Sequence, residues 1–348
     1  MVTLWFALAA VMMAGYAVLD GFDFGAGALH HHVARDDRER RQVLAAIGPY
    51  WDGNEVWLLA GGGVLFLAFP KVLAAGLSGF YLAVFILIWV LILRGIALEL
   101  RSHVADDLWR GFWDGVFTLA STLAPVLLGA ALGNVLRGVP LDADGWFALP
   151  LFDSFSPTGA PGLLDWYTVL CGVTALAAVA HHGALFLAWK TDGPVRARSR
   201  DAAARLFPAV VVLWLAATAA TFVLAPHVPR GLGARPLAWA ASALLLAGLA
   251  TSFHARRRGR DLLAFLGSAG FLLGVLGATA AAVYPVWLPS TLDPAFTLTA
   301  EAHAAAPESL RAGLLWWPFG LLLALAYLAL LFRLHRGKAQ ASPEGRGY

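Results

Sequence analysis

The chain contains about nine apolar stretches that are each long enough to cross a membrane, and mostly short polar loops separate them. A helix needs about 20 residues to cross roughly 30 Å of hydrocarbon. Hydrophobic residues make up 59% of the 348 residues and charged residues only 14%, and the mean hydropathy is +0.70. These values exclude a soluble domain and predict an all-α polytopic membrane protein. The expected spans are residues 3–24, 50–69, 76–100, 113–137, 164–189, 203–226, 236–254, 261–285 and 311–334.

The Lys and Arg residues are distributed very unevenly between alternate loops. An odd number of spans puts the two termini on opposite faces, and cytoplasmic loops carry most of the positive charge. We therefore predict that the N-terminus is outside and the C-terminus is cytoplasmic. The net charge of +3 does not indicate a nucleic-acid partner, because the basic residues lie in short loops. Apart from Arg94 within the third span, the outer face receives only Lys71, Arg137, Arg230, Arg235 and Arg311 of the 25 Lys and Arg residues.

Two longer loops divide what we expect to be a single integral membrane domain, residues 1–348. Residues 1–138 would form a first four-helix bundle and residues 164–285 a second. Residues 139–163 and 286–310 would be external loops, and residues 311–348 a peripheral ninth helix with a cytoplasmic tail. The Gly-rich runs Gly25–Gly27, Gly61–Gly63 and Gly129–Gly133 predict close helix approaches. The N-terminal span has no basic leader or cleavage site, so we interpret it as retained.

Carboxylates cluster where the first span ends and the second begins. Asp20 and Asp23 are three residues apart and share a helix face, as do Asp52 and Glu55. The first span runs inward and the second outward, so all four should lie toward the cytoplasmic side. Ionisable residues inside a membrane are costly and usually functional.

Further polar and aromatic residues are expected at the same depth: Arg94, Glu99 and Asp114, with Trp51, Asn54 and Trp57 beside the carboxylates. Helix N-terminal turns favour carboxylates, which would account for Asp52, Glu55 and Asp114 but not for Asp20 and Asp23. A buried acid–base cluster around Arg94 is a structural alternative. A water-linked set of carboxylates that takes up protons from the cytoplasm is the functional one.

The histidines give little support for a haem site. Of ten His, only His181 and His182 lie well within a span, and as neighbours they point about 100° apart on a helix. We interpret both as packing residues and expect no metal or cofactor to be ligated by this chain. Cys171 is alone, which excludes an internal disulfide.

Several segments together resemble subunit II of the cytochrome bd ubiquinol oxidases, and the resemblance extends over essentially the whole chain. The two acidic motifs and their spacing are its most specific part. The segments are DGFDFGAG at 20–27, GPYWDGNEVWL at 48–58, Phe69-Pro70, SGFYLA at 78–83, Arg94 with Glu99-Leu-Arg101, GNVLRGVP at 133–140 and YPVWLPS at 284–290.

The resemblance implies a subunit of an oxidase in the bacterial cytoplasmic membrane that takes electrons from a quinol and reduces dioxygen to water. In that family haems b and d and the quinol-oxidising loop belong to subunit I, so the chain alone would not be catalytic. The implied partners are subunit I and the lipid bilayer. The resemblance leaves open a small single-helix accessory subunit and a structural quinone or lipid. Asp52, Glu55, Asp20 and Asp23 are the candidate proton route.

Two other functions stay open at this point. A proton-coupled secondary transporter would also place acidic residues in its first helices, but such transporters commonly repeat the pattern in both halves, and the second half has no counterpart here. A scaffolding membrane subunit without a chemical role cannot be separated from a proton-conducting one by sequence.

Overall fold

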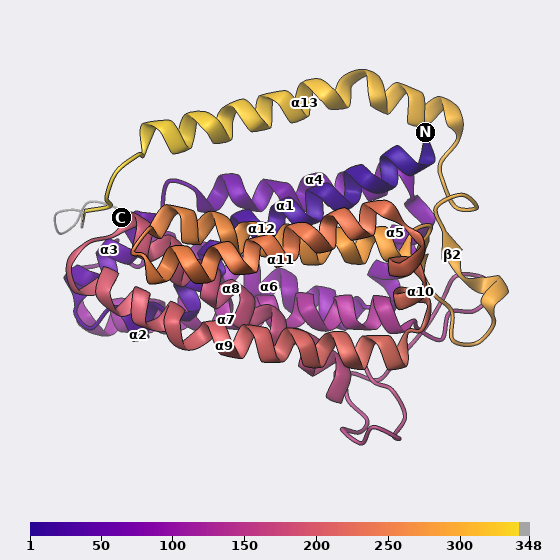
Figure 1. The fold of residues 1–348 in the computed structure, drawn as a ribbon, viewed down its shortest axis with the longest axis horizontal. Helices are drawn as coiled ribbons and strands as arrows, with labels where there is room; N and C mark the ends of the chain where they lie inside the picture. Colours follow the sequence, from indigo (N-terminus) through magenta and orange to yellow (C-terminus); the bar gives the residue numbers. More distant parts are fainter. Residues whose placement is uncertain (341–348) are drawn as a thin grey trace.

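The computed structural model describes residues 1–340 and is mostly helical (Figure 1). This confirms the prediction of an all-α polytopic membrane protein. The cytoplasmic tail was predicted to continue to residue 348, and residues 341–348 lie outside the described part. Within residues 1–340, eight helices are long and apolar enough to span a membrane: α1 (Val2–Ala28), α6 (Tyr81–Leu100), α7 (Asp107–Arg137), α8 (Trp166–Lys190), α9 (Gly193–Leu224), α11 (Pro236–Arg257), α12 (Asp261–Val283) and α13 (Pro307–Leu334).

The expected second span corresponds to α4 (Trp51–Ala68), which is not among these eight. Its 18 residues begin with a polar turn that contains Asp52, Asn54 and Glu55, and this turn lowers its mean hydropathy. The direction of the chain fits α4 as a further crossing. The starts of α1 and α13 lie together, because the Trp5 indole donates to the Leu310 carbonyl at 3.2 Å. The two helices run in the same direction (Figure 1), which requires an odd number of crossings.

Several short elements lie at the two ends of the helices and were not expected. They are α2 (His30–Val33), α3 (Asp37–Ile47), α5 (Pro70–Gly79), α10 (His227–Ala234), the 3-10 turn η1 (Pro294–Phe296), and the antiparallel strands β1 (Val286–Leu288) and β2 (Leu298–Thr299). Two spans also begin earlier than expected, α7 at Asp107 and α9 at Gly193. For α7 the reason is a cap, since the Asp106 carboxylate accepts the Trp109 amide at 2.8 Å.

Helix α1 lies at the centre of the packing. It contacts α4 and α7 from the first half of the chain and α8 and α12 from the second. Helix α13 lies at the edge of the molecule (Figure 1). Its principal helix contact is α4, and none of the residues in its most apolar stretch is buried. The two halves of the chain therefore share an extensive interface, and α13 is peripheral.

The Gly-rich run at the end of α1 allows close contact with α8. A Cβ atom placed on Gly25 would lie 1.9 Å from the Val179 carbonyl oxygen, and Gly183 of α8 faces the same point. A Cβ atom placed on Gly129 of α7 would likewise lie 2.7 Å from the carbonyl oxygen of Cys171 in α8. The expectation of close approach is wrong for Gly62 and Gly63 within residues 1–340, because a Cβ atom placed on either would meet no atom of another helix within 4 Å.

We predict that Gly25→Ala destabilises the protein, because its methyl group would force α1 and α8 apart. Overpacking of this kind typically costs about 1–3 kcal/mol. Gly62→Ala is the matched control, since it adds a methyl group to a helix in open space and should be neutral or slightly stabilising. Thermal unfolding of the purified membrane protein measures both. Equal melting temperatures for the two variants would contradict the close approach.

The charge distribution gives a second prediction, on sidedness. Reporter fusions near residues 37, 198 and 258 should score as cytoplasmic, and fusions near residues 150 and 300 as external. In the structure the first three positions belong to α3, α9 and the α11–α12 connection, at the end of the molecule where α13 ends. A reversed score at any one of these positions would show that a crossing has been miscounted.

Candidate functional site

Arg94 joins two of the carboxylates predicted to lie together. It is fully buried on α6. Its Nη1 donates to Asp20 Oδ1 of α1 at 2.5 Å, and its Nη2 donates to Glu55 Oε1 of α4 at 2.5 Å. The guanidinium also lies 4.3 Å from the centre of the Phe24 ring, a cation–π contact. Three helices are thus connected through one side chain.

Asp23 lies in the same region but is bound differently. Asn54 Nδ2 donates to Asp23 Oδ2 at 2.7 Å and to the Leu19 carbonyl at 3.0 Å. Asp23 therefore pairs with an amide, while Arg94 pairs with Asp20. The Asn54 amide fixes the end of α1 against the first turns of α4.

The Arg94 cluster, which we define as Asp20, Asp23, Asn54, Glu55 and Arg94, retains unused hydrogen-bonding capacity. The buried atoms Asp20 Oδ2, Asp23 Oδ1, Asn54 Oδ1 and Arg94 Nε have no hydrogen-bond partner among the described residues. One guanidinium also faces three carboxyl groups. In a medium of low dielectric constant, such a charge excess favours a cluster that holds a proton.

The exposure of the carboxylates decreases from the surface into the Arg94 cluster. Asp52 is exposed in the first turn of α4. The Glu55 side chain, one turn further on, is 30% exposed, and the Asp20 side chain is 0% exposed. Within residues 1–340, Asp52 forms no ion pair with Arg94. It lies at the mouth of the cluster and not inside it.

The two tryptophans near the carboxylates line the helix contacts. Trp57 is buried against Gly15 of α1, and half-buried Trp51 lies against Gly95 of α6. Glu99 is exposed near the end of α6. Trp57 thus fills the α1–α4 contact and Trp51 the α4–α6 contact.

Asp114 belongs to a separate buried cluster. It accepts from Arg101 Nε at 2.6 Å and from Arg40 Nη1 at 3.2 Å, and His30 Nε2 lies 2.8 Å from it. The helix-capping explanation for Asp114 is wrong, because α7 begins at Asp107 with Asp106 as its cap. The partners His30, Arg40 and Arg101 were missed, although the three-histidine run after the first span was a usable signal. Burial lowers the pKa of His30, and the Asp114 carboxylate opposes this shift.

His181 and His182 use all four ring nitrogens in contacts within the protein. His181 lies within hydrogen-bonding distance of the Ala203 carbonyl (3.1 Å) and Ser252 Oγ (3.2 Å). His182 is bound in the same way by Ser268 Oγ (2.6 Å) and the Val18 carbonyl (3.0 Å). Haem iron needs a free ring nitrogen, so these two side chains do not fit haem ligation in this arrangement.

The family model for cytochrome bd terminal oxidase subunit II matches residues 1–335. The chain belongs to this family. It is a multi-pass protein of the bacterial inner membrane. The bd oxidase from Geobacillus thermodenitrificans has the same fold: the TM-score is 0.73 at 21% sequence identity, over 96% of this chain and 98% of that chain.

Two relatives of this subunit II have similar sequences. Cytochrome bd ubiquinol oxidase subunit 2 of Bacillus subtilis is 33% identical over 309 residues, which is 88% of each chain. Cytochrome bd-I ubiquinol oxidase subunit 2 of Escherichia coli is 38% identical over 200 residues, or 58% of this chain. The match spans about half, 52%, of the E. coli protein.

Proposed function

We propose that this chain works as subunit II of a quinol:oxygen oxidoreductase and that it provides a proton uptake route for the reduction of dioxygen to water. The observation that carries the proposal is the bridge from Arg94 to Asp20 and Glu55 beside Asp23. A purely apolar contact between α1, α4 and α6 would be simpler to stabilise in a membrane. Buried ionisable groups there are expensive, which favours a functional reason for retaining them.

In the proposed route, Asp52 collects a proton at the surface and Glu55 passes it inward. The two residues are three apart on α4, so their side chains are neighbours about 5–6 Å apart at Cβ. Glu55 is both partly exposed and bonded to Arg94. Protonation of Glu55 weakens its bond to Arg94, and Arg94 then pairs mainly with Asp20. The shared cation therefore couples the charge of Glu55 to that of the buried carboxyl groups.

The chemistry at oxygen belongs, in this proposal, to a haem-bearing subunit I. When bound there, haem supplies the electron transfer and the oxygen-reducing centre. The full use of the ring nitrogens of His181 and His182 supports this division of roles. The chain shown here would bind the partner within the membrane, and hold and move protons at its carboxylates.

A scaffolding subunit is the second candidate function. The observation that favours it is the pairing of Arg94 with Asp20 and Glu55, since a guanidinium bonded to carboxylates of two other helices also fixes their packing. The two functions make different predictions for a substitution that keeps shape but removes titration. A transporter function receives no support from the family to which the chain belongs.

We predict that the chain expressed alone carries no haem, and that co-expression with its subunit I yields a membrane complex with quinol oxidase activity. A tag on this chain and a reduced-minus-oxidised spectrum of the purified sample measure this. Stoichiometric haem on the isolated chain would contradict the proposed division of roles. Purification without any haem-bearing partner after co-expression would contradict the partnership itself.

A further inference from the structure

The connection between α11 and α12 concentrates positive charge at one end of the molecule. Arg256, Arg257, Arg258 and Arg260 occupy four of five consecutive positions. Gly259 between them has a φ of +67°, in the left-handed region that glycine adopts readily. The chain can therefore reverse tightly into α12, which keeps the arginines close to both helix ends.

The only carboxylate of this connection is already neutralised. Asp261 accepts from Arg196 Nη2 at 2.7 Å and from Arg200 Nε at 2.8 Å, both on α9. Arg256 and Arg257 lie over aromatic rings, with Arg257 5.3 Å from the centre of Phe253. Within residues 1–340, Arg258 and Arg260 take part in no ion pair. Both side chains are exposed, so two guanidinium groups lack an anion within that range.

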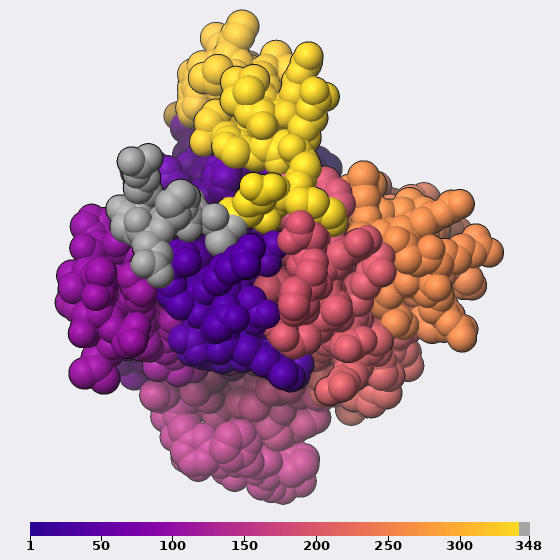
Figure 2. Space-filling model, turned by 90° about the vertical axis from the view of Figure 1, so that its left-hand side faces the viewer, coloured from indigo at the N-terminus to yellow at the C-terminus, as the bar shows by residue number. Residues whose placement is uncertain are grey.

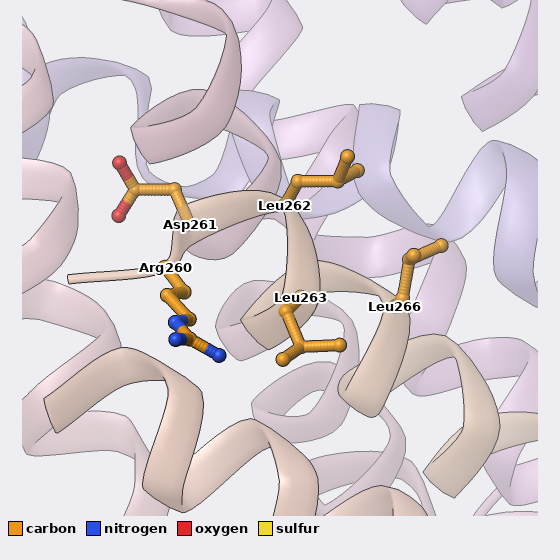
Figure 3. A pocket seen from close by; sticks show the side chains of 5 residues that line it. All are labelled: Arg260, Asp261, Leu262, Leu263 and Leu266. Atoms are coloured by element: carbon orange, nitrogen blue, oxygen red, sulfur yellow. The ribbon is translucent and has the colours of Figure 1, made fainter. Parts of the chain in front are cut away.

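These two arginines border a pair of adjoining grooves. One groove of about 250 Å³ is lined by His254, Arg258, Arg260, Leu263 and Ala250, among others. The other, of about 330 Å³, is lined by Arg260, Asp261 and three leucines of α12. Figure 3 shows Arg260 on the same side of α12 as Leu263, with the Asp261 carboxylate on the other side. The grooves thus combine a cationic rim with an aliphatic wall.

The aliphatic wall faces outward on a membrane-spanning helix. Leu262, Leu263 and Leu266 are 44%, 41% and 52% exposed at the start of α12. Figure 2 views the molecule from this end, and the orange segment that includes the α11–α12 connection forms its edge. The arginines lie at the helix ends and the leucines follow within the span. This order matches the headgroup and acyl regions of one membrane leaflet.

We propose that the ends of α11 and α12 bind one anionic phospholipid, such as phosphatidylglycerol. Its phosphate is held by Arg258 and Arg260, and one acyl chain lies along Leu263 and Leu266. Basic pockets between membrane helices on the cytoplasmic side recognise such headgroups. A zwitterionic headgroup carries its own cation, which the two guanidinium groups repel. A soluble phosphate would gain nothing from the leucine wall. The site is separate from the Arg94 cluster, and its existence does not depend on the proposed function.

Native mass spectrometry of the purified complex, titrated with phosphatidylglycerol and with phosphatidylcholine of the same acyl chains, tests this proposal. Each arginine near a membrane surface contributes about fivefold to the binding of an anionic lipid. The double variant Arg258→Gln with Arg260→Gln should therefore bind phosphatidylglycerol roughly 30-fold more weakly at one site. The matched control is Arg333→Gln with Arg336→Gln, exposed arginines near the end of α13, which should leave that site unchanged.

Two further measurements separate a lipid from other occupants. The variant Leu263→Ser with Leu266→Ser should also weaken phosphatidylglycerol binding, and millimolar inorganic phosphate should not displace the lipid from the wild type. If phosphate displaced the lipid, or if the leucine variant bound phosphatidylglycerol as tightly as the wild type, the site would be a free-anion site and the proposal would be overturned. Equal affinity of the wild type for phosphatidylglycerol and phosphatidylcholine would also overturn the proposal. So would a cross-link from position 260 to a protein subunit in place of a lipid.

Discussion

Arg94→Ala is expected to abolish assembly of the membrane complex or reduce it severely. The substitution would leave Asp20, which is fully buried, and Glu55 without their shared cation. Removing one partner of a buried ion pair typically costs about 3–5 kcal/mol, because the remaining charge is uncompensated. That is a large fraction of the stability of an ordinary domain, which is about 5–15 kcal/mol. The yield of assembled complex after mild solubilisation measures the effect.

A neutral double variant separates the loss of charge from the loss of packing. Arg94→Met with Asp20→Asn removes the cation and its buried partner together while keeping similar volumes. If uncompensated charge causes the defect, this double variant should assemble much better than Arg94→Ala, because apolar replacement of a buried pair is often nearly neutral. Equal defects in the two variants would show that Arg94 acts through shape and its contact with Phe24.

Glu55→Gln is expected to slow oxygen reduction by the assembled complex by about 100-fold or more, the lower range for loss of a proton-transferring side chain. Glutamine keeps the shape and can still accept the bond from Arg94, but it cannot cycle between charged and neutral forms. Assembly and haem content should therefore remain close to those of the wild type. Steady-state oxygen consumption, normalised to haem, measures the turnover.

Asp52→Asn should have a smaller effect than Glu55→Gln. From the sequence alone, Asp52 is the favoured proton-entry residue, because it begins a helix at the cytoplasmic side beside Trp51 and Gly53. In the structure Asp52 is exposed, so bulk water can deliver protons to Glu55 when the Asp52 carboxylate is absent. Glu308→Gln, an exposed carboxylate in the first turn of α13, is a control that should leave turnover unchanged.

The sequence predicted which carboxylates would lie at one depth, because span direction and the order of polar residues fix depth. It could not predict which aspartate would meet Arg94. Asp20 and Asp23 are less than one helical turn apart, and the rotation of α6 about its own axis decides between them. The rotation depends on packing against α7 and α1, including contacts such as Phe24 with Arg94.

The cluster at Asp114 was missed for a different reason. Its partners come from the short helix α2, from α3 and from the C-terminal end of α6, and the basic residues of these loops were interpreted only as signals of membrane orientation. Helix α3 itself has an Asp36 cap that accepts the Glu39 amide. Asp36 followed three residues later by Glu39 is a recognisable helix-start signal, whereas α10 and the β1–β2 pair are too short to show a periodic pattern.

Charge separation during a single turnover tests the central claim, proton uptake through the Arg94 cluster, most directly. The complex would be reconstituted in vesicles, fully reduced and exposed to oxygen, while the membrane voltage is recorded with time. We predict that in Glu55→Gln the electron transfer phases keep their rates while the voltage phase from proton uptake slows in parallel with turnover, and that Glu308→Gln behaves as the wild type. A wild-type voltage phase in a fully assembled Glu55→Gln complex would contradict the proton uptake role and leave the Arg94 cluster a structural ion pair.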